Sequence, residues 1–325
     1  MRIVILAGGI GGSRFVLGVR RAYPDAEITV LGNTGDDITL YGLRICPDLD
    51  TVMYALGGAN DPVRGWGRRD ETWTVMSELG GYEAEQSWFA LGDRDLATHL
   101  ERTRLLAAGQ PLSAVTQLLC ERWQGPEPGI RLLPMTDDPV ETQVVIADET
   151  APAGRRAVHF QEYWVKLHAE PDALEVRLDG ASDARPAPGV TAAIRAADVI
   201  LLAPSNPVVS IGPIIAVPGI RAAIAEAAAP VLGFAGILGG APVSGMAHRL
   251  LPAIGVAVDA GSVGLHYGPR SLGGLLDLWT MDVRDAALAP RVERAGLPVA
   301  VADLLMSSPE ATAAFVTYAI KTAQR

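Results

Sequence analysis

Hydrophobic and polar positions follow two different periods along the first forty residues of the chain. A short apolar run rich in β-branched residues, RIVILA at 2–7, ends in glycine and predicts a buried strand. Residues 13–24 carry apolar side chains at helical spacing before a proline, and a second strand-like run follows at 27–32. This order of strand, turn, helix and strand is typical of the start of an α/β fold with a parallel sheet.

The pattern changes in the middle of the chain and then returns. Residues 61–124 lack β-branched runs, and the stretches at 95–109 and 112–123 have the spacing of amphipathic helices. Apolar, strand-like runs come back at 130–137, 140–148, 155–167, 197–206, 230–238 and 255–262. We therefore predict an α/β fold class, with a Rossmann-like, mostly parallel sheet core over residues 1–60 and 126–325. A helical insertion subdomain is predicted at 61–125.

Composition narrows the range of partners. The chain of 325 residues is 49% hydrophobic and 20% charged, as in a globular protein, and it has no uninterrupted apolar run long enough to cross a bilayer. The first apolar run is too short for a signal peptide, and two cysteines are too few for a disulfide framework, so we expect a cytoplasmic location and no membrane partner. A net charge of −10 argues against nucleic acid. Since lysine occurs only at Lys166 and Lys321, a phosphate ligand would need backbone amides, arginines or a metal ion held by carboxylates.

A glycine-rich loop joins the first predicted strand to the first predicted helix. Backbone N–H groups and the positive end of a helix can hold a phosphate there, although a tight turn without a ligand is the plain alternative. The fingerprint of dinucleotide-binding proteins is incomplete, because Arg14 stands where its third glycine belongs and Gly32 and Asn33 stand where an acid would hold the ribose. The loop is also similar to that of sugar nucleotidylyltransferases, but neither lysine follows at a suitable place. Its glycines are Gly8, Gly9, Gly11 and Gly12.

A second loop follows the apolar strand predicted near residue 200. The sequence APSNPVVSIG at 203–212 presents Ser205 and Asn206 between two prolines, and Ser210 and Gly212 follow. Serine and asparagine are also common turn and cap residues, so composition alone leaves both interpretations open. Its position at the end of a core strand, on the side of the glycine loop, favours a second anion-binding loop.

Four aspartates gather after the second predicted strand: Asp36, Asp37, Asp48 and Asp50. Taken singly, the first two fit a turn, and one of the last two fits the cap of the helix predicted at 51–58. If residues 48–50 are extended, the last two carboxylates point the same way. As a set, these side chains could hold a Mg²⁺ ion that bridges the phosphates of a bound diphosphate. We find no Ser-His-Asp, metal-histidine or redox-cysteine pattern, which disfavours covalent and zinc chemistry.

Several longer motifs together resemble one known family. They are GGIGG at 8–12, NTGDD at 33–37, CPDLDT at 46–51, GWGRRDETW at 65–73, WFALGDRDLATHL at 88–100, HFQEYWV at 159–165 and LAPSNPVVSIGPI at 202–214. In this order they are similar to the 2-phospho-L-lactate transferase family of coenzyme F(420) biosynthesis. The similarity is greatest to its actinobacterial-type phosphoenolpyruvyl transferases, and it runs across nearly the whole chain.

The resemblance implies an activity and a set of site residues. It implies a homodimer that uses Mg²⁺ to transfer a phospholactyl or phosphoenolpyruvyl group from a guanosine diphosphate derivative to the ribityl hydroxyl of the deazaflavin Fo, with release of GMP. The insertion would contribute to the acceptor site. Carried onto this sequence, the donor would be held by Gly8, Gly9, Gly11, Gly12, Ser13, Ser205, Asn206, Ser210 and Gly212, the metal by Asp36, Asp48 and Asp50, and Fo by Asp37, Trp66, Trp88 and Arg94, with Asp36 and Asp50 as the catalytic carboxylates.

Two other functions remain open at this point. One is a nucleotide-sensing regulator without catalysis from the same superfamily, and the other is a sugar-nucleotide transferase. The aspartate pairs and the tryptophan-rich insertion favour an enzyme with a large acceptor. The sequence leaves open whether the donor carries lactate, enolpyruvate or a phosphoglycerate-type group.

Overall fold

A seven-stranded parallel sheet forms the centre of the fold in the computed structural model, which describes residues 1–82, 85–123 and 129–324. The strands lie in the order β14-β13-β10-β9-β1-β2-β5, and each neighbouring pair runs parallel. Their bounds are β1 (Arg2–Ala7), β2 (Glu27–Gly32), β5 (Ile130–Pro134), β9 (Val199–Leu202), β10 (Val231–Phe234), β13 (Leu278–Asp282) and β14 (Val299–Ala302). The predicted α/β fold class with a mostly parallel core sheet is therefore confirmed.

Helices cover the two faces of this sheet. The long helix α1 packs against α12 and α2, while α6 packs against α8 near β1. The α-helices are α1 (Gly9–Ala22), α2 (Pro47–Leu56), α3 (Thr74–Gly81), α4 (Asp93–Ala107), α5 (Leu112–Glu121), α6 (Val190–Ala196), α7 (Gly212–Ala216), α8 (Ile220–Glu226), α9 (Ala247–Leu250), α10 (Ala260–Tyr267), α11 (Ala289–Arg294) and α12 (Pro309–Ala323). Shorter π and 3₁₀ turns are η1 (Glu162–Lys166), η2 (Pro207–Ile211), η3 (Pro252–Ile254), η4 (Arg270–Leu272) and η5 (Val283–Leu288).

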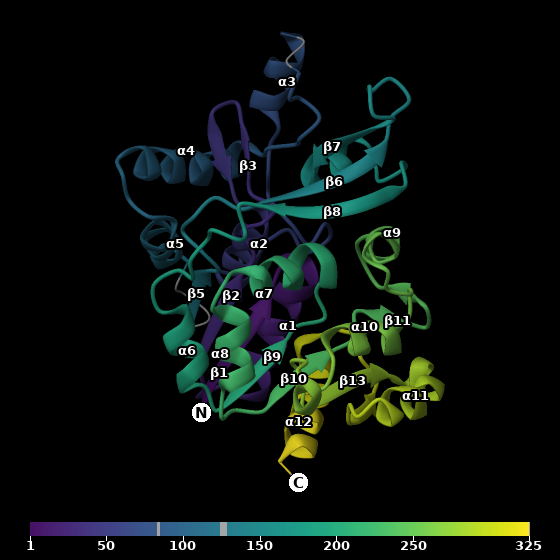
Figure 1. The fold of residues 1–325 in the computed structure, drawn as a ribbon. Helices are drawn as coiled ribbons and strands as arrows, with labels where there is room; N and C mark the ends of the chain where they lie inside the picture. The colour runs from purple at the N-terminus through teal and green to yellow at the C-terminus, as the bar shows by residue number, and fades with distance from the viewer. Residues whose placement is uncertain (83–84, 124–128, 325) are drawn as a thin grey trace.

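A second layer of structure lies beyond one end of the main sheet. It contains the hairpin of β3 (Ile38–Leu40) and β4 (Leu43–Ile45), and the antiparallel sheet β7-β6-β8 formed by β6 (Glu141–Ala147), β7 (Arg155–His159) and β8 (Ala173–Asp179). Figure 1 shows both beside α3 and α4, at the end of the molecule opposite the two termini. A third small hairpin, β11 (Ile237–Leu238) with β12 (Ala241–Pro242), follows β10.

The structure differs from the sequence-based expectation at three places. The first helix begins at Gly9, so Gly9, Gly11 and Gly12 of the predicted glycine loop lie in its first turn. The strand predicted at 255–262 is wrong, because residues 260–262 already belong to α10 and the next core strand is β13. The strand-like runs at 140–148 and 155–167 supply β6 and β7 of the separate antiparallel sheet instead of extending the core, and the second run is wrong beyond His159, because residues 162–166 form η1. The predicted insertion at 61–125 contains α3, α4 and α5, and its boundary at 125 and 126 falls outside the described residues.

Within residues 1–82, 85–123 and 129–324, no single helix combines the length and the apolar composition needed to cross a bilayer. The bent pair Pro207–Ala216 and Ile220–Glu226, whose helices meet at 84°, has enough apolar length when its two helices are taken together. The side chains of Ile211, Ile214 and Ile220 have no exposed surface, so this pair packs into the protein core.

The order of the strands marks the place where a ligand can bind. From β1 the chain moves to β2 and β5 on one side, while β9, β10, β13 and β14 lie on the other side. The chain therefore continues from β1 and from β9 toward opposite edges of the sheet, and this change of direction places a crevice at the carboxyl ends of the two strands. In open α/β sheets this switch point is where ligands bind.

Candidate active site

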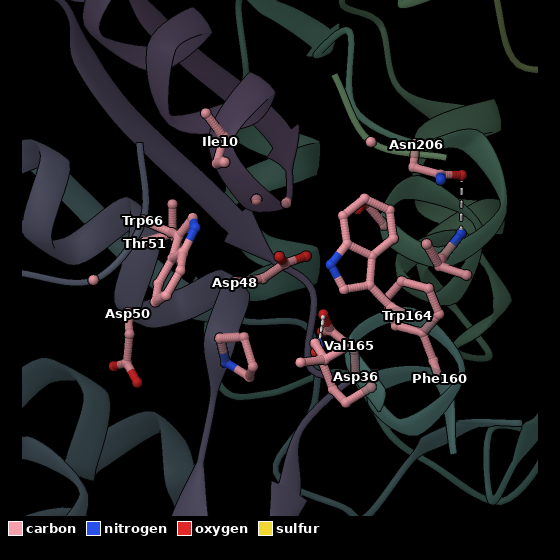
Figure 2. A pocket seen from close by; sticks show the side chains of 18 of the residues that line it. Ile10, Asp36, Asp48, Asp50, Thr51, Trp66, Phe160, Trp164, Val165 and Asn206 are labelled. Atoms are coloured by element: carbon pink, nitrogen blue, oxygen red, sulfur yellow. Dashed lines mark hydrogen bonds between the residues drawn. The ribbon is translucent and has the colours of Figure 1, made fainter. Parts of the chain in front are cut away.

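A cavity of about 570 Å³ lies at this switch point, within the size range of ligand pockets. The glycine loop after β1, the start of α2 and the loop after β9 line its middle. One end is aromatic through Trp66 and Phe89, and the other through Phe160 and Trp164. Figure 2 shows Asp48 between these ends, with Trp66 on one side and Trp164 on the other.

The two predicted anion loops contact each other directly. The Ser205 hydroxyl donates to the carbonyl of Gly8 at 2.8 Å and accepts from the Gly8 N–H at 3.2 Å. Glycine is required at both of the first two loop positions. A Cβ on Gly8 would lie 2.2 Å from Asp48 Oδ2, and Gly9 has a φ of +61°. The loops therefore bring backbone N–H groups and the Asp48 carboxylate to one point.

Asn33 holds two buried carboxylates together at the centre of the cavity. Its Nδ2 lies 2.8 Å from Asp36 Oδ1, 3.0 Å from Asp48 Oδ2 and 3.0 Å from the carbonyl of Val209. Its Oδ1 accepts from the Gly35 N–H, which fixes the orientation of the amide. Gln161 adds a bond from Nε2 to Asp36 Oδ2 at 3.0 Å. Because one NH₂ group has two hydrogens for three acceptors, Asn33 alone cannot satisfy both carboxylates and the Val209 carbonyl.

Burial makes this pair costly to ionise. Burial raises the pKa of Asp36 well above its usual range, and the charges of Asp48 and Asp37 raise it further. Burial likewise raises the pKa of Asp48 to about 6, although bonds from Asn33, Gly9 and Ser210 lower it in part. Within the part of the chain that the structure describes, no positively charged side chain pairs with either carboxylate. A cation would remove the repulsion between them.

Helix α2 separates Asp48 from Asp50. The interpretation in which one of them caps this helix is wrong, because the helix begins at Pro47 and both residues lie in its first turn. The extended geometry is also wrong for the same reason. Residues two apart on a helix point about 200° away from each other, so Asp48 faces Asn33 while Asp50 faces α4.

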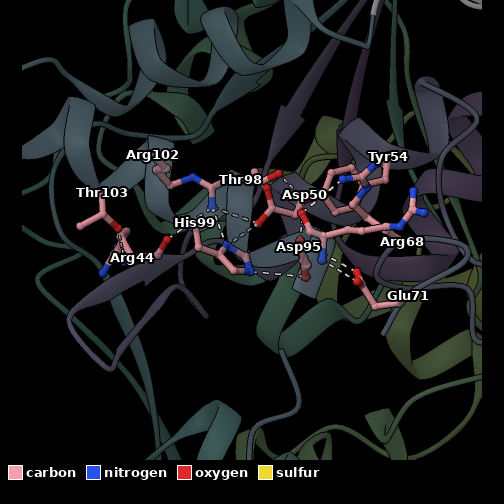
Figure 3. Close-up of polar contacts among 11 residues, drawn as sticks. Arg44, Asp50, Tyr54, Arg68, Glu71, Asp95, Thr98, His99, Arg102 and Thr103 are labelled. Carbon is pink, nitrogen blue, oxygen red and sulfur yellow. Dashed lines mark hydrogen bonds and ion pairs between the residues drawn. The ribbon is translucent and has the colours of Figure 1, made fainter. Parts of the chain in front are cut away.

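Asp50 belongs to a buried polar network on the Trp66 side of the cavity (Figure 3). Arg102 donates to both of its oxygens, at 3.0 Å through Nη1 and by a short bond through Nη2. Burial lowers the pKa of Arg102, but the charge and hydrogen bonds of Asp50 together with the nearby Cys46 and Tyr54 outweigh it, so the pKa lies above its usual range. His99 places Nδ1 3.7 Å from Asp50 and Nε2 3.3 Å from Asp95, whose other oxygen accepts from the Tyr54 hydroxyl at 2.5 Å.

The contacts of His99 favour one tautomer of its neutral ring. Three side chains of the same network form a group that could bind a metal ion. Arg102 Nη1 lies 3.3 Å from His99 Nδ1 and can only donate, so the proton of a neutral His99 sits on Nε2, toward Asp95. Ligand atoms of Asp50, Asp95 and His99 lie within 4.8 Å of one another and could hold an ion. Unlike the pair of Asp36 and Asp48, however, this group already has the cation of Arg102.

The cavity includes some of the residues carried over from the family resemblance and leaves out others. Trp66 lines the cavity, but Trp88, Arg94 and Asp37 do not. Trp88 packs edge-on against Phe89, and Asp37 is buried with Arg44 Nη2 3.3 Å from its Oδ2. Burial raises the pKa of Asp37 to about 7, although Arg44 lowers it in part.

The residues predicted to bind the donor also divide into two groups. Gly8, Gly9, Gly11, Ser205, Asn206 and Ser210 line the cavity, while Gly12, Ser13 and Gly212 lie behind it. Ser13 donates to the Ile10 carbonyl at 2.9 Å, and Asn206 caps η2 by accepting from the Val208 N–H at 2.9 Å. The interpretation of Asn206 as a cap residue is therefore confirmed, and Asn206 also lines the cavity.

Sequence reasoning missed several residues of the site. Asn33 stands where a dinucleotide-binding protein has an acid that holds the ribose. Its role in this site was not predicted, although it belongs to the NTGDD motif. Gln161, Phe160 and Trp164 come from the HFQEYWV motif, and Arg102 lies three residues after His99 on α4. No local pattern marks these side chains, because they meet the aspartates only through the packing of distant elements.

The fold and the cavity together define an α/β protein with a ligand site at the switch point of a parallel sheet. A family profile described as "2-phospho-L-lactate transferase CofD" matches residues 3–302. The chain belongs to this family. The resemblance seen in the sequence motifs is therefore confirmed.

Known relatives agree with this assignment, and one solved structure shares the fold. The chain is 56% identical to a "Phosphoenolpyruvate transferase" of Streptomyces griseus over 100% of this chain and 99% of the relative. It is 50% identical to a protein of the same description from Mycobacterium bovis, covering 97% of each chain. Protein BH3568 of Bacillus halodurans has a similar fold, with a TM-score of 0.62 and 17% identity over 98% of this chain and 99% of that one.

Proposed function

We propose that this protein transfers the phosphorus-linked acid group of a guanosine diphosphate derivative to the ribityl hydroxyl of Fo and releases GMP. The observation that carries the proposal is the buried pair of Asp36 and Asp48 beside the two loops that meet at Gly8 and Ser205. Relatives named phosphoenolpyruvate transferases at 50–56% identity support an enolpyruvyl group as the acid. The homodimer and the cytoplasmic location stay predictions.

Mg²⁺ fits the donor set at the centre of the cavity. Asp36 and Asp48 offer carboxylate oxygens, which Mg²⁺ prefers, and their charges repel each other with no cationic side chain of the described residues paired to either one. These two residues would hold the ion. When bound, Mg²⁺ supplies positive charge to the donor diphosphate in a chain that places no lysine in the cavity lining among the described residues.

The residues of the chain bind and orient the two substrates. The N–H groups at the start of α1 and the side chains of Ser205 and Ser210 face the diphosphate. Aromatic side chains at the Trp66 end can stack on the flat deazaflavin. Asp50 lies at that same end, where Arg102 holds its carboxylate in place. Positioning of this kind supplies most of the catalysis when the chemistry needs no covalent enzyme intermediate.

The transfer forms one bond and breaks one bond. The ribityl oxygen of Fo bonds to the phosphorus that bears the acid group. The bond from that phosphorus to the bridging oxygen breaks, and the oxygen leaves with GMP. The hydroxyl proton passes to a carboxylate, for which Asp50 is the proposed acceptor because Asp36 and Asp48 face the donor.

A direct assay tests the proposal. Purified protein is incubated with Fo, Mg²⁺ and guanosine diphosphate derivatives of enolpyruvate, lactate and phosphoglycerate, and GMP and coupled deazaflavin are quantified by mass spectrometry. We expect equal amounts of both products, with the enolpyruvyl donor fastest. Nucleotide binding without GMP release from any donor would instead support a non-catalytic regulator.

Gly8→Ala tests the role of the glycine loop. The φ of Gly8 is −148°, so alanine fits the backbone, but its Cβ would meet Asp48 Oδ2 and Ser210 Cβ at 2.2 and 2.8 Å. We expect the Kd for GDP with Mg²⁺ to rise at least about tenfold, because Asp48 has to move. Gly80→Ala is the matched control, since its Cβ would have no neighbour within 4 Å. Unchanged GDP binding in Gly8→Ala would contradict the assigned loop.

A further inference from the structure

Helix α4 is capped by a side chain from a distant part of the sequence. Its N-cap residue is Gly92, which has no side chain to accept from the first N–H groups of the helix. Glu71 takes this role: its Oε1 accepts from the Arg94 N–H at 2.6 Å, and its Oε2 accepts from the Asp95 N–H at 3.1 Å. One carboxylate therefore satisfies two N–H groups and faces the positive end of the helix.

Asp93 caps helix α3 in return. Its carboxylate accepts from the Thr72 hydroxyl at 2.6 Å and from the N–H groups of Thr74 and Val75, both at 3.0 Å. These bonds, with the Thr72 hydroxyl first, lower the pKa of Asp93 to about 2, so the carboxylate is charged at neutral pH. The starts of α3 and α4 are thus joined in both directions. We name the two contacts, Glu71 on α4 and Asp93 on α3, the cap exchange.

We propose that Glu71 is a positioning residue for the acceptor, because the cap exchange holds two walls at the Trp66 end of the cavity. The inference rests on the proposed function and deepens it, since Fo is assigned to that end. Neither Glu71 nor Asp93 lines the cavity, so both act through other side chains.

The first wall is the loop that leads to Glu71. The Arg64 guanidinium lies 5.2 Å from the ring centre of Trp66 and 5.1 Å from that of Trp73. Trp73 is the N-cap residue of α3, within the segment that the cap exchange holds. Arg64 and Trp66 line the cavity, while Trp73 does not. A fixed Trp73 therefore helps to fix Trp66 through the arginine that contacts both rings.

The second wall is the first turn of α4. Glu71 binds the Asp95 N–H, and the Asp95 side chain lines the cavity. The Asp95 carboxylate accepts from the Tyr54 hydroxyl at 2.5 Å and lies 3.3 Å from His99 Nε2 (Figure 3). His99 Nδ1 in turn lies 3.7 Å from Asp50. A movement of the start of α4 would therefore reach the carboxylate proposed to accept the proton of the acceptor hydroxyl.

The backbone on both sides of the contact is shaped for Glu71. Asp70 has a φ of +53°, a left-handed conformation that few residues other than glycine adopt and that surrounding contacts have to hold. Gly92 has a φ of −72°, which suits alanine, but a Cβ there would overlap Cγ and Cδ of Glu71. Glycine is therefore needed at position 92 to make room for the Glu71 side chain.

Two variants disturb the cap exchange in different ways. Glu71→Gln keeps the size of the side chain and removes its charge, whereas Gly92→Ala keeps Glu71 and displaces its side chain. The matched controls are Glu78→Gln, at an exposed glutamate of α3, and Gly80→Ala, whose Cβ would have no neighbour within 4 Å. Isothermal titration measures the Kd of Fo with GDP and Mg²⁺ present and, separately, the Kd of GDP with Mg²⁺. Amide hydrogen exchange follows residues 60–75, and thermal unfolding checks the fold.

The expected result separates the acceptor from the donor. We expect both variants to weaken Fo at least about tenfold and to change the Kd of GDP less than about twofold, while the controls change neither. The Kd of GDP is spared because Ser205, and not Glu71, holds the glycine loop at Gly8. Exchange at residues 60–75 should become faster in both variants, as expected when a local contact is lost.

Three other results would count against the inference. A lower melting temperature with an unchanged Kd of Fo would show that Glu71 serves stability alone and would overturn it. Equal weakening of GDP and Fo would also overturn it, because the effect would then not be confined to the acceptor end. A wild type that binds no Fo would contradict both the positioning role and the proposed function, whereas a wild type that binds Fo but transfers nothing would contradict the proposed function alone.

Discussion

Arg102→Met is expected to lower the free energy of unfolding by about 3–5 kcal/mol, because it leaves the Asp50 carboxylate buried without its cation. Both side chains are almost fully buried, with 2% and 6% of their surface exposed. Arg102 donates to both oxygens of Asp50 and also contacts His99 and the Arg44 carbonyl. Chemical unfolding at pH 7.5, followed by circular dichroism, measures the loss.

Two further variants test whether the unpaired charge of Asp50 causes this loss of stability. Arg104→Met removes an arginine from the same helix whose side chain is 64% exposed, and we expect a change below about 0.5 kcal/mol. The double variant Arg102→Met/Asp50→Asn should be more stable than Arg102→Met, since the unpaired charge is gone. A loss below about 1 kcal/mol in Arg102→Met, or no recovery in the double variant, would contradict the buried ion pair.

Asp48→Asn is expected to reduce transfer by about 100-fold or more and, at the same time, to stabilise the protein without metal. Transfer falls because the pair loses one of the two charges that hold the donor through the ion. Stability rises because a buried carboxylate repelled by Asp36 becomes a neutral amide that can still accept from Asn33. The gain is on the order of 2 kcal/mol. Transfer rates and unfolding in the presence of a chelator measure the two effects.

The gain in stability should depend on pH. Because burial raises the pKa of Asp48 from 3.8 to about 6, the folded state binds a proton more tightly than the unfolded state. Asp48 therefore makes the wild type lose stability as the pH rises from about 4 to about 6. The difference between Asp48→Asn and the wild type should be small near pH 4 and complete above about pH 7. A gain that shrinks with rising pH would show that Asp48 has the opposite shift.

The sequence predicted most of the core because its strands are short, apolar and bounded by turn residues. β1 and β2 follow their local patterns closely, and so do α4 and α5, whereas α1 begins at Gly9, before its predicted start at residue 13. The strand expected at 255–262 failed because an apolar run with small residues also suits a helix start, and Asp259 caps α10. Pairing partners were not predictable for β6, β7 and β8, since nothing local says which sheet a strand joins.

The site was predictable where motifs follow core strands and unpredictable where distant side chains meet. The glycine loop, the loop at 203–212 and the aspartates all follow elements that end at one edge of the sheet. Asp36 and Asp48 share Asn33, whereas Asp50 pairs with Arg102. This difference between Asp48 and Asp50 depends on where α2 begins. Placing that start a few residues too late made Asp48 and Asp50 look equivalent, and only the helical geometry separates them.

The central claim is that Asp36 and Asp48 together hold a divalent cation on the donor diphosphate. The most direct test is Mn²⁺ binding in the presence of GDP, measured by electron paramagnetic resonance on the wild type, on Asp36→Asn/Asp48→Asn and on Asp50→Asn. We predict one tightly bound Mn²⁺ per chain in the wild type and in Asp50→Asn, and none in the Asp36 and Asp48 double variant. Full Mn²⁺ binding in that double variant, or its loss in Asp50→Asn alone, would contradict the account.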